Sequence, residues 1–160
     1  MLILVGMPGT GKTTIATYLQ NQYKVRMLDL DDYICRTYKK NLFQLIEKNG
    51  EKEFSRLEDK CFQDVLNQNN VDILATGGSV IYCDMSNAMK NHIVIHLLTD
   101  YKTLYRRTDA FRNRGIIYNG MSPEELYIAR NKLYEKFSHY TIFCKDQSVK
   151  EIAEKVHKLI

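Results

Sequence analysis

The feature that most constrains this chain is a glycine-rich segment close to its start. Residues 6–13 read Gly-Met-Pro-Gly-Thr-Gly-Lys-Thr, which matches the pattern G-x-x-x-x-G-K-[ST]. A short apolar run at 2–5 precedes the segment, and a helical pattern opens after it at Thr13. Strand, loop and helix therefore follow one another in the order that a phosphate-binding loop requires. This order predicts a binding site for a nucleoside triphosphate.

The chemistry of such a loop suggests what its residues do. Glycines let backbone N–H groups approach phosphate oxygens closely, and the N-terminus of the following helix adds a partial positive charge. We expect Lys12 to reach the β- and γ-phosphates and the Thr13 hydroxyl to bind Mg²⁺. A glycine turn that only caps a helix is the alternative. The residues predicted to bind ATP are Gly9, Thr10, Gly11, Lys12, Thr13 and Thr14.

Length and composition restrict the class of protein. The chain has 160 residues, which suits a single domain (1–160) with a substantial core. No apolar stretch approaches the ~18 residues of a membrane helix, and no secretory signal precedes the loop, so we expect no membrane association. The net charge of +4 suits a small anionic substrate better than nucleic acid. Four cysteines without C-x-x-C spacing indicate free thiols in the cytoplasm, and we expect a monomer.

Apolar runs alternate with helical patterns along the whole chain. This alternation predicts an α/β fold, with three layers and a central parallel sheet of about five strands between helices. Ligands then bind beyond the C-terminal ends of the strands. The long segment at 109–121 between two helical patterns is typical of a mobile lid. The expected strands are 2–5, 25–28, 73–75, 93–98 and 140–144, and clear helical patterns occur at 54–66, 102–108 and 123–137.

Two carboxylates follow the second expected strand. Asp29 and Asp31 alternate at its end, and in an extended chain they would share one face and point into one cavity. Phosphoryl transfer to a hydroxyl needs Mg²⁺ near the β- and γ-phosphates and a carboxylate at the attacking oxygen. The alternative is an acidic helix start, in which Asp31 or Asp32 caps a helix from Tyr33. The nearby phosphate loop favours the first interpretation for Asp29 and Asp31, and Asp32 keeps the interpretation as a helix cap.

A second glycine turn and two arginines are further candidates. Gly77 and Gly78 follow the expected strand 73–75, where backbone N–H groups could approach a ligand, although a plain connection is the alternative. Arg114 lies in the expected lid, from which an arginine can neutralise charge on a transferring phosphoryl group. Arg130 could bind substrate or pair with neighbouring acidic side chains. These positions complete the candidate site.

In combination, these segments resemble the shikimate kinase family, which lies within the P-loop kinases of small molecules and nucleoside monophosphates. The resemblance covers nearly the whole chain and is far more specific than the phosphate loop alone. It rests on the loop at 6–13, D-x-D at 29–31, G-E-x-x-F at 50–54, L-A-T-G-G at 74–78 and R-x-x-L-Y at 130–134.

The resemblance implies roles on the acceptor side of the site. Asp29 would hold Mg²⁺ through water, and Asp31 would bind the acceptor hydroxyl and help to take its proton. Gly77 and Gly78 would line the acceptor. Arg130 would pair with the carboxylate of the acceptor.

The resemblance also implies roles on the nucleotide side. Lys12 would hold phosphate, and Arg114 would close over the transferring phosphoryl group as the lid arginine. Arg107 and the turn at Asp146 and Gln147 would flank the adenine.

The chain departs from the family pattern mainly on the acceptor side. Shikimate kinases carry an arginine directly after the phenylalanine of G-E-x-x-F, and it grips the substrate carboxylate. Here that position is Ser55, and the arginine is Arg56. One helical residue corresponds to a rotation of about 100°, so we expect Arg56 to point away. The family's third glycine is replaced by Ser79, and the lid reads R-G-I-I at 114–117.

These observations predict an ATP- and Mg²⁺-dependent kinase of a small anionic acceptor. The leading reaction is the conversion of shikimate to shikimate 3-phosphate. A kinase of a related hydroxy acid, polyol or nucleoside monophosphate is one alternative. A regulatory module that binds ATP without turnover is another.

Overall fold

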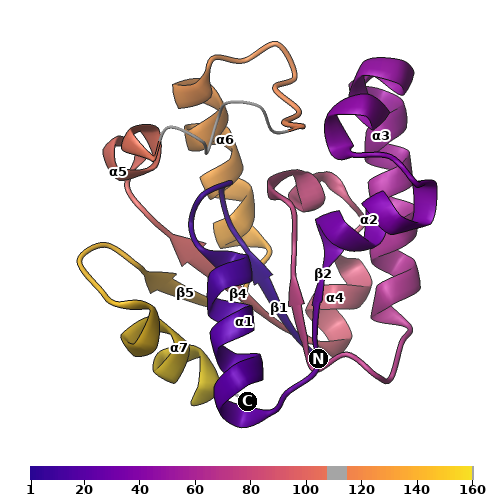
Figure 1. The fold of residues 1–160 in the computed structure, drawn as a ribbon. Coiled ribbons are helices and arrows are strands. Elements are labelled where there is room, and N and C mark those ends of the chain that lie inside the picture. Colours follow the sequence, from indigo (N-terminus) through magenta and orange to yellow (C-terminus); the bar gives the residue numbers. More distant parts are fainter. Residues whose placement is uncertain (108–114, 160) are drawn as a thin grey trace.

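A computed structural model describes residues 1–107 and 115–159, and it places a β-sheet between layers of helices (Figure 1). The strands are β1 (Leu2–Val5), β2 (Met27–Asp29), β3 (Ile73–Ala75), β4 (Ile93–Leu98) and β5 (Tyr140–Phe143). The helices are α1 (Lys12–Tyr23), α2 (Leu30–Tyr38), α3 (Leu42–Leu66), the 3₁₀ helix η1 (Gly78–Tyr82), α4 (Ser86–Asn91), α5 (Tyr101–Arg106), α6 (Pro123–Lys136) and α7 (Val149–His157).

The five strands pair in the order β2-β3-β1-β4-β5, and every pairing is parallel. β1 therefore lies at the centre of the sheet, between β3 and β4. The predicted α/β fold with a five-stranded parallel sheet is confirmed. The expected strands at 2–5, 73–75 and 93–98 match the observed bounds, because short apolar runs in a parallel sheet are buried on both faces.

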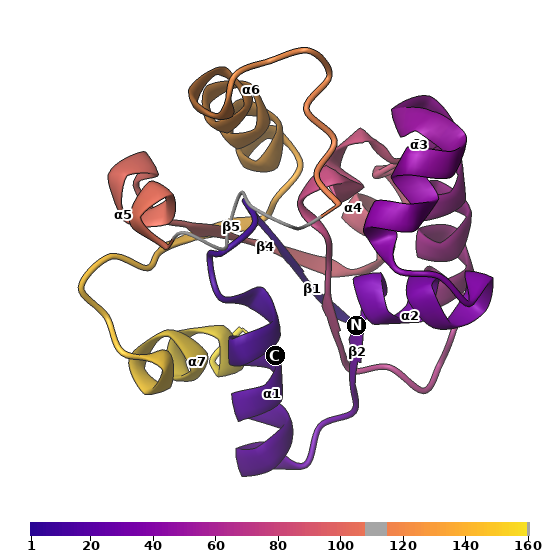
Figure 2. The same cartoon turned by 45° about the horizontal axis from the view of Figure 1, so that its top comes forward.

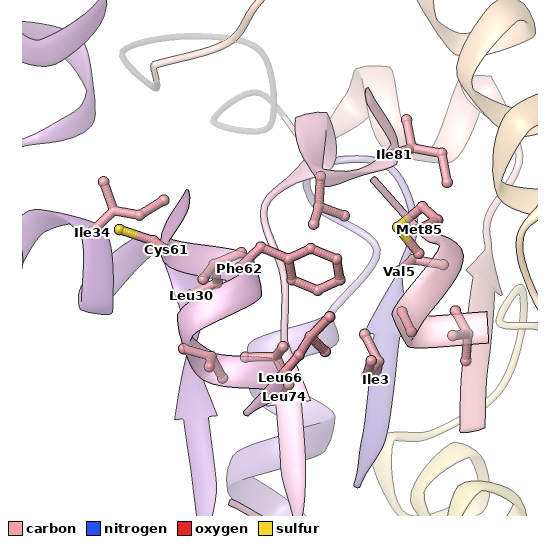
Figure 3. Packing of buried hydrophobic residues seen from close by; sticks show 14 of the residues in the cluster. Ile3, Val5, Leu30, Ile34, Cys61, Phe62, Leu66, Leu74, Ile81 and Met85 are labelled. Carbon is pink, nitrogen blue, oxygen red and sulfur yellow. The ribbon is translucent and has the colours of Figure 1, made fainter. Parts of the chain in front are cut away.

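The alternation of side chains along β1 divides the core into two layers. Ile3 and Val5 join one buried cluster, and Leu2 and Leu4 join the other. Figure 2 shows α1 and α7 packed together on one face of the sheet, which is the face that Leu2 and Leu4 reach. The opposite face is covered by helices that include α3, α4 and α6. Figure 3 shows Phe62 of α3 packed in this second layer.

The C-terminal ends of β1 and β3 begin the segments that form the candidate site. The phosphate loop connects β1 to α1, and the turn at Gly77 and Gly78 connects β3 to η1. The Thr76 hydroxyl donates a hydrogen bond to the Leu4 carbonyl over 2.8 Å, and the Thr76 amide donates to the same oxygen over 3.2 Å. These bonds hold the second turn beside the phosphate loop, at the edge where ligands of parallel sheets bind.

The structure corrects the expectation for Asp29 and Asp31. β2 ends at Asp29 and α2 begins at Leu30, so Asp31 lies in the first helical turn rather than in an extended chain. The argument from a shared strand face is therefore wrong. The alternative, in which Asp31 or Asp32 caps the helix, is also wrong, including for Asp32. Asp29 is the N-cap of α2, and it accepts hydrogen bonds from the Asp31 and Asp32 amides over 3.0 and 3.3 Å.

Helix α3 begins earlier than the expected pattern at 54–66. It runs from Leu42 and contains a break at Gly50, where φ is +78°. Residues 109–114 of the expected lid lie outside the described residues, and residues 115–118 form neither helix nor strand. In the described ranges no helix combines the length and the apolar character needed to cross a membrane.

Candidate active site

A cleft of about 980 Å³ lies at the C-terminal ends of the strands. The phosphate loop forms one part of its wall, and the turn at Gly77 and Gly78 forms another. Nine of the residues that line the cleft were predicted from the sequence to have a role in binding or catalysis: Gly9, Gly11, Lys12, Thr13, Thr14, Asp31, Gly77, Gly78 and Arg107. Lining residues without a predicted binding role include Asn41, Leu42, Phe43, Phe54, Thr76, Ser79 and Arg106.

The phosphate loop is held in a conformation that suits an anion. Gly11, with φ of +95°, is the N-cap of α1, and the first turn of α1 contains no acidic residue that would oppose an anion. The buried Lys12 ammonium donates to the Gly6 and Met7 carbonyls, over 2.7 and 2.9 Å. The Thr10 hydroxyl donates to the Met7 carbonyl over 3.0 Å, so Thr10 supports the loop from within.

Thr13 and Asp29 bring two oxygen donors together. The Thr13 hydroxyl donates to Asp29 Oδ2 over 2.7 Å, although the residues are sixteen positions apart in the chain. The other Asp29 oxygen, Oδ1, is engaged by the start of α2. One carboxylate therefore both caps a helix and faces the phosphate loop. Hard oxygen ligands of this kind suit Mg²⁺.

Charged side chains from three elements converge on the second glycine turn. A Cβ atom added at Gly77 would lie 2.5 Å from Asp31 Oδ1 and 3.0 Å from Glu58 Oε1. A Cβ atom added at Gly78 would lie 2.7 Å from Pro8 Cδ and 3.0 Å from Arg130 Nη1. Only glycine fits at these two positions without displacing its neighbours. The turn therefore packs against two carboxyl groups at Gly77 and against one guanidinium at Gly78.

The Arg130 guanidinium is buried, with 1% of the residue exposed. Its Nη2 atom donates to the Ile117 carbonyl over 2.6 Å, and its Cζ atom lies 5.3 Å from the centre of the Tyr82 ring. None of the ion pairs within the described ranges includes Arg130. Arg130 is not itself among the residues that line the cleft, but it lies against Gly78, which is. A buried cation without an ion-pair partner in the described ranges is suited to receive an anion.

The neighbouring tyrosine of α6 fixes the glycine turn. The buried Tyr134 hydroxyl donates to the Gly78 carbonyl, and its ring centre lies 5.2 Å from that of His96 on β4. His96 Nε2 in turn lies 3.1 Å from Asn131 Oδ1. Burial lowers the pKa of His96 to about 4, so the ring is neutral at pH 7. These contacts connect α6, and with it Arg130, to the sheet.

Glu58 is the acidic residue that the sequence reasoning missed. It is buried in α3, with 1% of the residue exposed, and neither carboxyl oxygen has a well-formed hydrogen bond in the part of the chain that the structure describes. Burial raises the pKa of Glu58 to about 8, and the nearby Ser79 hydroxyl opposes the shift. One signal was available, since Phe54, Glu58 and Phe62 are spaced by four and share the apolar face of the helix.

The residues predicted to contact the adenine lie in two different places in the structure. Arg107 Nη1 donates to the Gly9 carbonyl over 2.6 Å, which places this arginine against the phosphate loop. Asp146 and Gln147 lie in the turn between β5 and α7, outside the set of residues that line the cleft. Gln147 is bonded there to the Phe143 carbonyl and to the Lys155 ammonium. Arg114 lies outside the described residues.

The positions of Ser55 and Arg56 agree with the expected helical rotation. The Ser55 hydroxyl donates to the Glu51 carbonyl over 3.0 Å, within its own helix. The exposed Arg56 guanidinium pairs with Glu53 over 3.2 Å on the solvent side of α3. Arg56 therefore does not replace an arginine at position 55. Ser55 instead borders a smaller cavity of about 440 Å³, lined by Glu51, Lys52, Ser55, Tyr82 and Asn119.

The fold and the site define a P-loop kinase of a small molecule. The phosphate loop forms one part of the wall of the cleft, and the second glycine turn, against which charged side chains pack, forms another. The shikimate kinase family model matches residues 8–160, which is almost the entire chain. The chain belongs to the shikimate kinase family.

Individual relatives agree with this assignment. A shikimate kinase of Staphylococcus aureus is 31% identical, with 99% of this chain and 92% of the relative covered. A shikimate kinase of Nitrosomonas europaea is 28% identical, with 97% of this chain and 75% of the relative covered. The solved structure of a shikimate kinase from Acinetobacter baumannii in complex with shikimate has a TM-score of 0.87 at 27% identity. The match covers 99% of this chain and 90% of that structure's chain.

Proposed function

We propose that this chain transfers the γ-phosphoryl group of ATP to the 3-hydroxyl of shikimate. The observation that most supports the acceptor is the buried Arg130 guanidinium beside Gly78, which has no ion-pair partner in the described ranges and faces the same turn as Asp31. A guanidinium binds a carboxylate, and a carboxylate can orient a hydroxyl. Shikimate carries both a carboxylate and a hydroxyl. The bound shikimate in the related Acinetobacter baumannii structure supports the same substrate.

The phosphate loop would bind the triphosphate. Gly9, Gly11 and the start of α1 would offer backbone N–H groups, and Lys12 would turn from the Gly6 and Met7 carbonyls toward the phosphates. Thr10 would support the loop, and Thr14 would line the cleft beside it. Arg107, which already contacts the loop, would lie beside the nucleotide.

Thr13 and Asp29 would hold Mg²⁺. Their oxygens lie 2.7 Å apart, and no cluster of three His, Cys, Asp or Glu side chains occurs in the described ranges that could bind a metal without phosphate. This small set fits Mg²⁺, which usually takes one or two protein ligands and completes its shell with phosphate and water oxygens. The chemistry that the ion supplies is neutralisation of charge on the phosphate oxygens.

Asp31 would act at the acceptor hydroxyl. Its Oδ1 atom lies against Gly77, and the next residue of the turn, Gly78, lies against Pro8 of the phosphate loop. From this position it could orient the hydroxyl and accept its proton, while Arg130 holds the acceptor carboxylate. The proposal gives Arg114 the role of the lid arginine, and Asp146 and Gln147 contacts with the adenine. It further takes the chain to be a monomeric, cytoplasmic enzyme.

A related hydroxy acid is the second candidate acceptor. The observation that favours it is the combination of Ser55 with an outward Arg56, which leaves Arg130 as the arginine that reaches the acceptor end from the described ranges. An acceptor that needs only one guanidinium would fit such a site. Loss of one arginine contact to a carboxylate costs about 2–5 kcal/mol when the charge pair is buried.

Release of ADP from Mg²⁺-ATP, coupled to an enzymatic readout, tests the proposed function. Saturable turnover that depends on shikimate, with KM from about 1 μM to 1 mM, is the expected result. The Asp31→Asn variant should lose about 10²–10⁴-fold in kcat with almost unchanged ATP affinity. Turnover with another hydroxy acid but not with shikimate would select the second candidate. ATP binding without any acceptor-dependent turnover would favour a regulatory module instead.

A further inference from the structure

A single peptide group links α3 to α6. Its carbonyl, from Ile117, accepts a hydrogen bond from Arg130 Nη2 over 2.6 Å. Its amide, from Tyr118, donates to Glu51 Oε1 over 3.0 Å, and the next amide, of Asn119, donates to Glu51 Oε2 over the same distance. Figure 2 shows the chain before α6 passing between α6 and α3. One peptide group therefore bridges a carboxylate of α3 and a guanidinium of α6.

The planar peptide group explains how the two charges are connected. The carbonyl and the amide of a trans peptide point in opposite directions, so Glu51 and Arg130 bind the chain at Ile117 from opposite sides. Hydrogen bonds in a chain polarise one another. A carboxylate on the amide therefore strengthens the carbonyl as an acceptor for the guanidinium.

A tight turn orders the backbone directly after this peptide group. The Met121 amide donates to the Tyr118 carbonyl over 3.0 Å, and Asn119 and Gly120 have φ of +51° and +73°. Positive φ at both central residues is the pattern of a type I′ turn, for which Asn-Gly is a favoured pair. Glu51 binds the first two amides of the turn, so it holds an ordered unit against α3.

The break in α3 places Glu51 for this contact. Gly50, directly before it, interrupts the helix with φ of +78°, a conformation that glycine adopts at little cost. The Glu51 carboxylate then lies in the first turn of the second helical part, where negative charge is favoured. Its two hydrogen bonds are charge-assisted, a kind that is about twice as strong as neutral ones. Gly50 and Glu51 therefore start this part of the helix and also fix the chain that contacts Arg130.

The Arg130 guanidinium keeps donor groups that this contact does not use. Nη1 lies against Gly78 of the cleft wall, and Nε has no hydrogen bond in the described part of the chain. A direct ion pair with Glu51 would occupy the guanidinium with a carboxylate and compete with an acceptor. The bridging peptide group instead restrains the guanidinium through Nη2 and leaves its charge available to an anion.

We propose, resting on the proposed function, that Glu51 is a positioning residue for the acceptor. It holds the Ile117 carbonyl, and through it the Arg130 guanidinium, in the orientation that binds an acceptor carboxylate. A guanidinium that is oriented beforehand loses less freedom when the acceptor arrives. The effect of Glu51 depends on Arg130 and on the carboxylate of the acceptor. An acceptor without this charge, such as the methyl ester of shikimate, is almost insensitive to Glu51.

The first test measures the shikimate KM at saturating Mg²⁺-ATP. Glu51→Gln places an amide donor against a backbone N–H, so KM should rise about tenfold, while kcat and the KM for ATP change less than about twofold. Glu53→Gln, at a carboxylate of the same helix that pairs with Arg56 in solvent, is the matched control and should leave KM unchanged. In an Arg130→Lys background, Glu51→Gln should raise KM less than about twofold further, because residues that act through one contact are not additive.

The second test does not require turnover. The Nε–H resonance of Arg130, assigned by its absence in Arg130→Lys, should exchange with solvent at least about fivefold faster in Glu51→Gln, while the amides of β1 keep their wild-type rates. Equal exchange in the two proteins would overturn the inference even if shikimate is phosphorylated. A KM increase that is as large in the Arg130→Lys background, or with the methyl ester, would also overturn it. Absence of shikimate turnover would reject the proposed substrate, and the exchange rates would still decide whether Glu51 positions Arg130.

Discussion

The Thr13 hydroxyl donates a hydrogen bond to Asp29 Oδ2 over 2.7 Å, and this contact ties the start of α1 to the start of α2. Asp29 also accepts from two amides of α2, so its carboxylate serves the fold as well as the proposed metal site. Two variants can separate these functions, because asparagine is a good N-cap and alanine is not.

We predict that Asp29→Asn folds with nearly wild-type stability but loses at least tenfold in kcat and needs more Mg²⁺ for half-maximal rate. Asp29→Ala should show the same kinetic loss and, in addition, lose about 1 kcal/mol of stability with the helix cap. Titration of the rate with Mg²⁺ and urea unfolding measure the two effects. Wild-type Mg²⁺ dependence in both variants would remove Asp29 from the metal site.

The Tyr134 hydroxyl donates to the Gly78 carbonyl, and this bond fixes the turn that we propose as the acceptor end of the cleft. We predict that Tyr134→Phe costs about 1 kcal/mol of stability, because the carbonyl of the partly buried Gly78 loses its donor. The shikimate KM should rise several-fold while the KM for ATP changes little. Tyr105→Phe, at a residue that is 63% exposed, is the matched control and should change neither quantity. A Tyr134→Phe enzyme with normal stability and KM would show that the turn does not depend on this bond.

Arg56 and Arg130 should respond in opposite ways to substitution. Arg56 pairs with Glu53 in solvent, so Arg56→Ala should change the shikimate KM less than twofold. Arg130→Lys keeps the charge but loses the planar fork that matches a carboxylate, and it should raise the KM at least tenfold. Steady-state kinetics with varied shikimate measure both changes. A large effect of Arg56→Ala would mean that α3 rotates when the acceptor binds.

The neutral state of His96 makes stability depend on pH. Its pKa is lowered to about 4 in the folded chain and returns to the ordinary value near 6.5 on unfolding, so protonation favours the unfolded state. The stabilisation is complete above pH 6.5 and is lost as the pH falls toward 4. We predict that the free energy of unfolding decreases between pH 6.5 and 5, by at most about 1.4 kcal/mol per pH unit, and that His96→Gln reduces this slope. An equal slope in the variant would assign the effect to other groups.

Local patterns predicted the parts of the fold that depend on neighbours in sequence. The segment at 6–13 fixes its own strand, loop and helix, because each glycine and the lysine act within one turn of chain. The buried strands followed from short apolar runs. Asp29 was different, since its position as N-cap depends on where α2 begins, and the acidic pattern alone was compatible with an extended chain.

The proposed acceptor end of the cleft is formed by contacts between residues that are remote in sequence, so local patterns could not predict it. The environment of Arg130 comes from Ile117 and Gly78, and the burial of Glu58 requires α3 to pack beneath the glycine turn. Motif matching located Arg130 but not the charged and polar residues that surround it. Glu58 could have been identified only by treating a glutamate on an apolar helix face as an exception that needs a reason.

Identification of the product is the most direct test of the central claim. The enzyme is incubated with Mg²⁺-ATP and shikimate, and the phosphorylated product is analysed by ³¹P and ¹H NMR. We predict one new phosphomonoester, attached at the 3-position of shikimate and formed in amounts equal to the ADP released. ADP without phosphorylated shikimate, or a phosphate carried by another acceptor in a competition mixture, would contradict the proposed function.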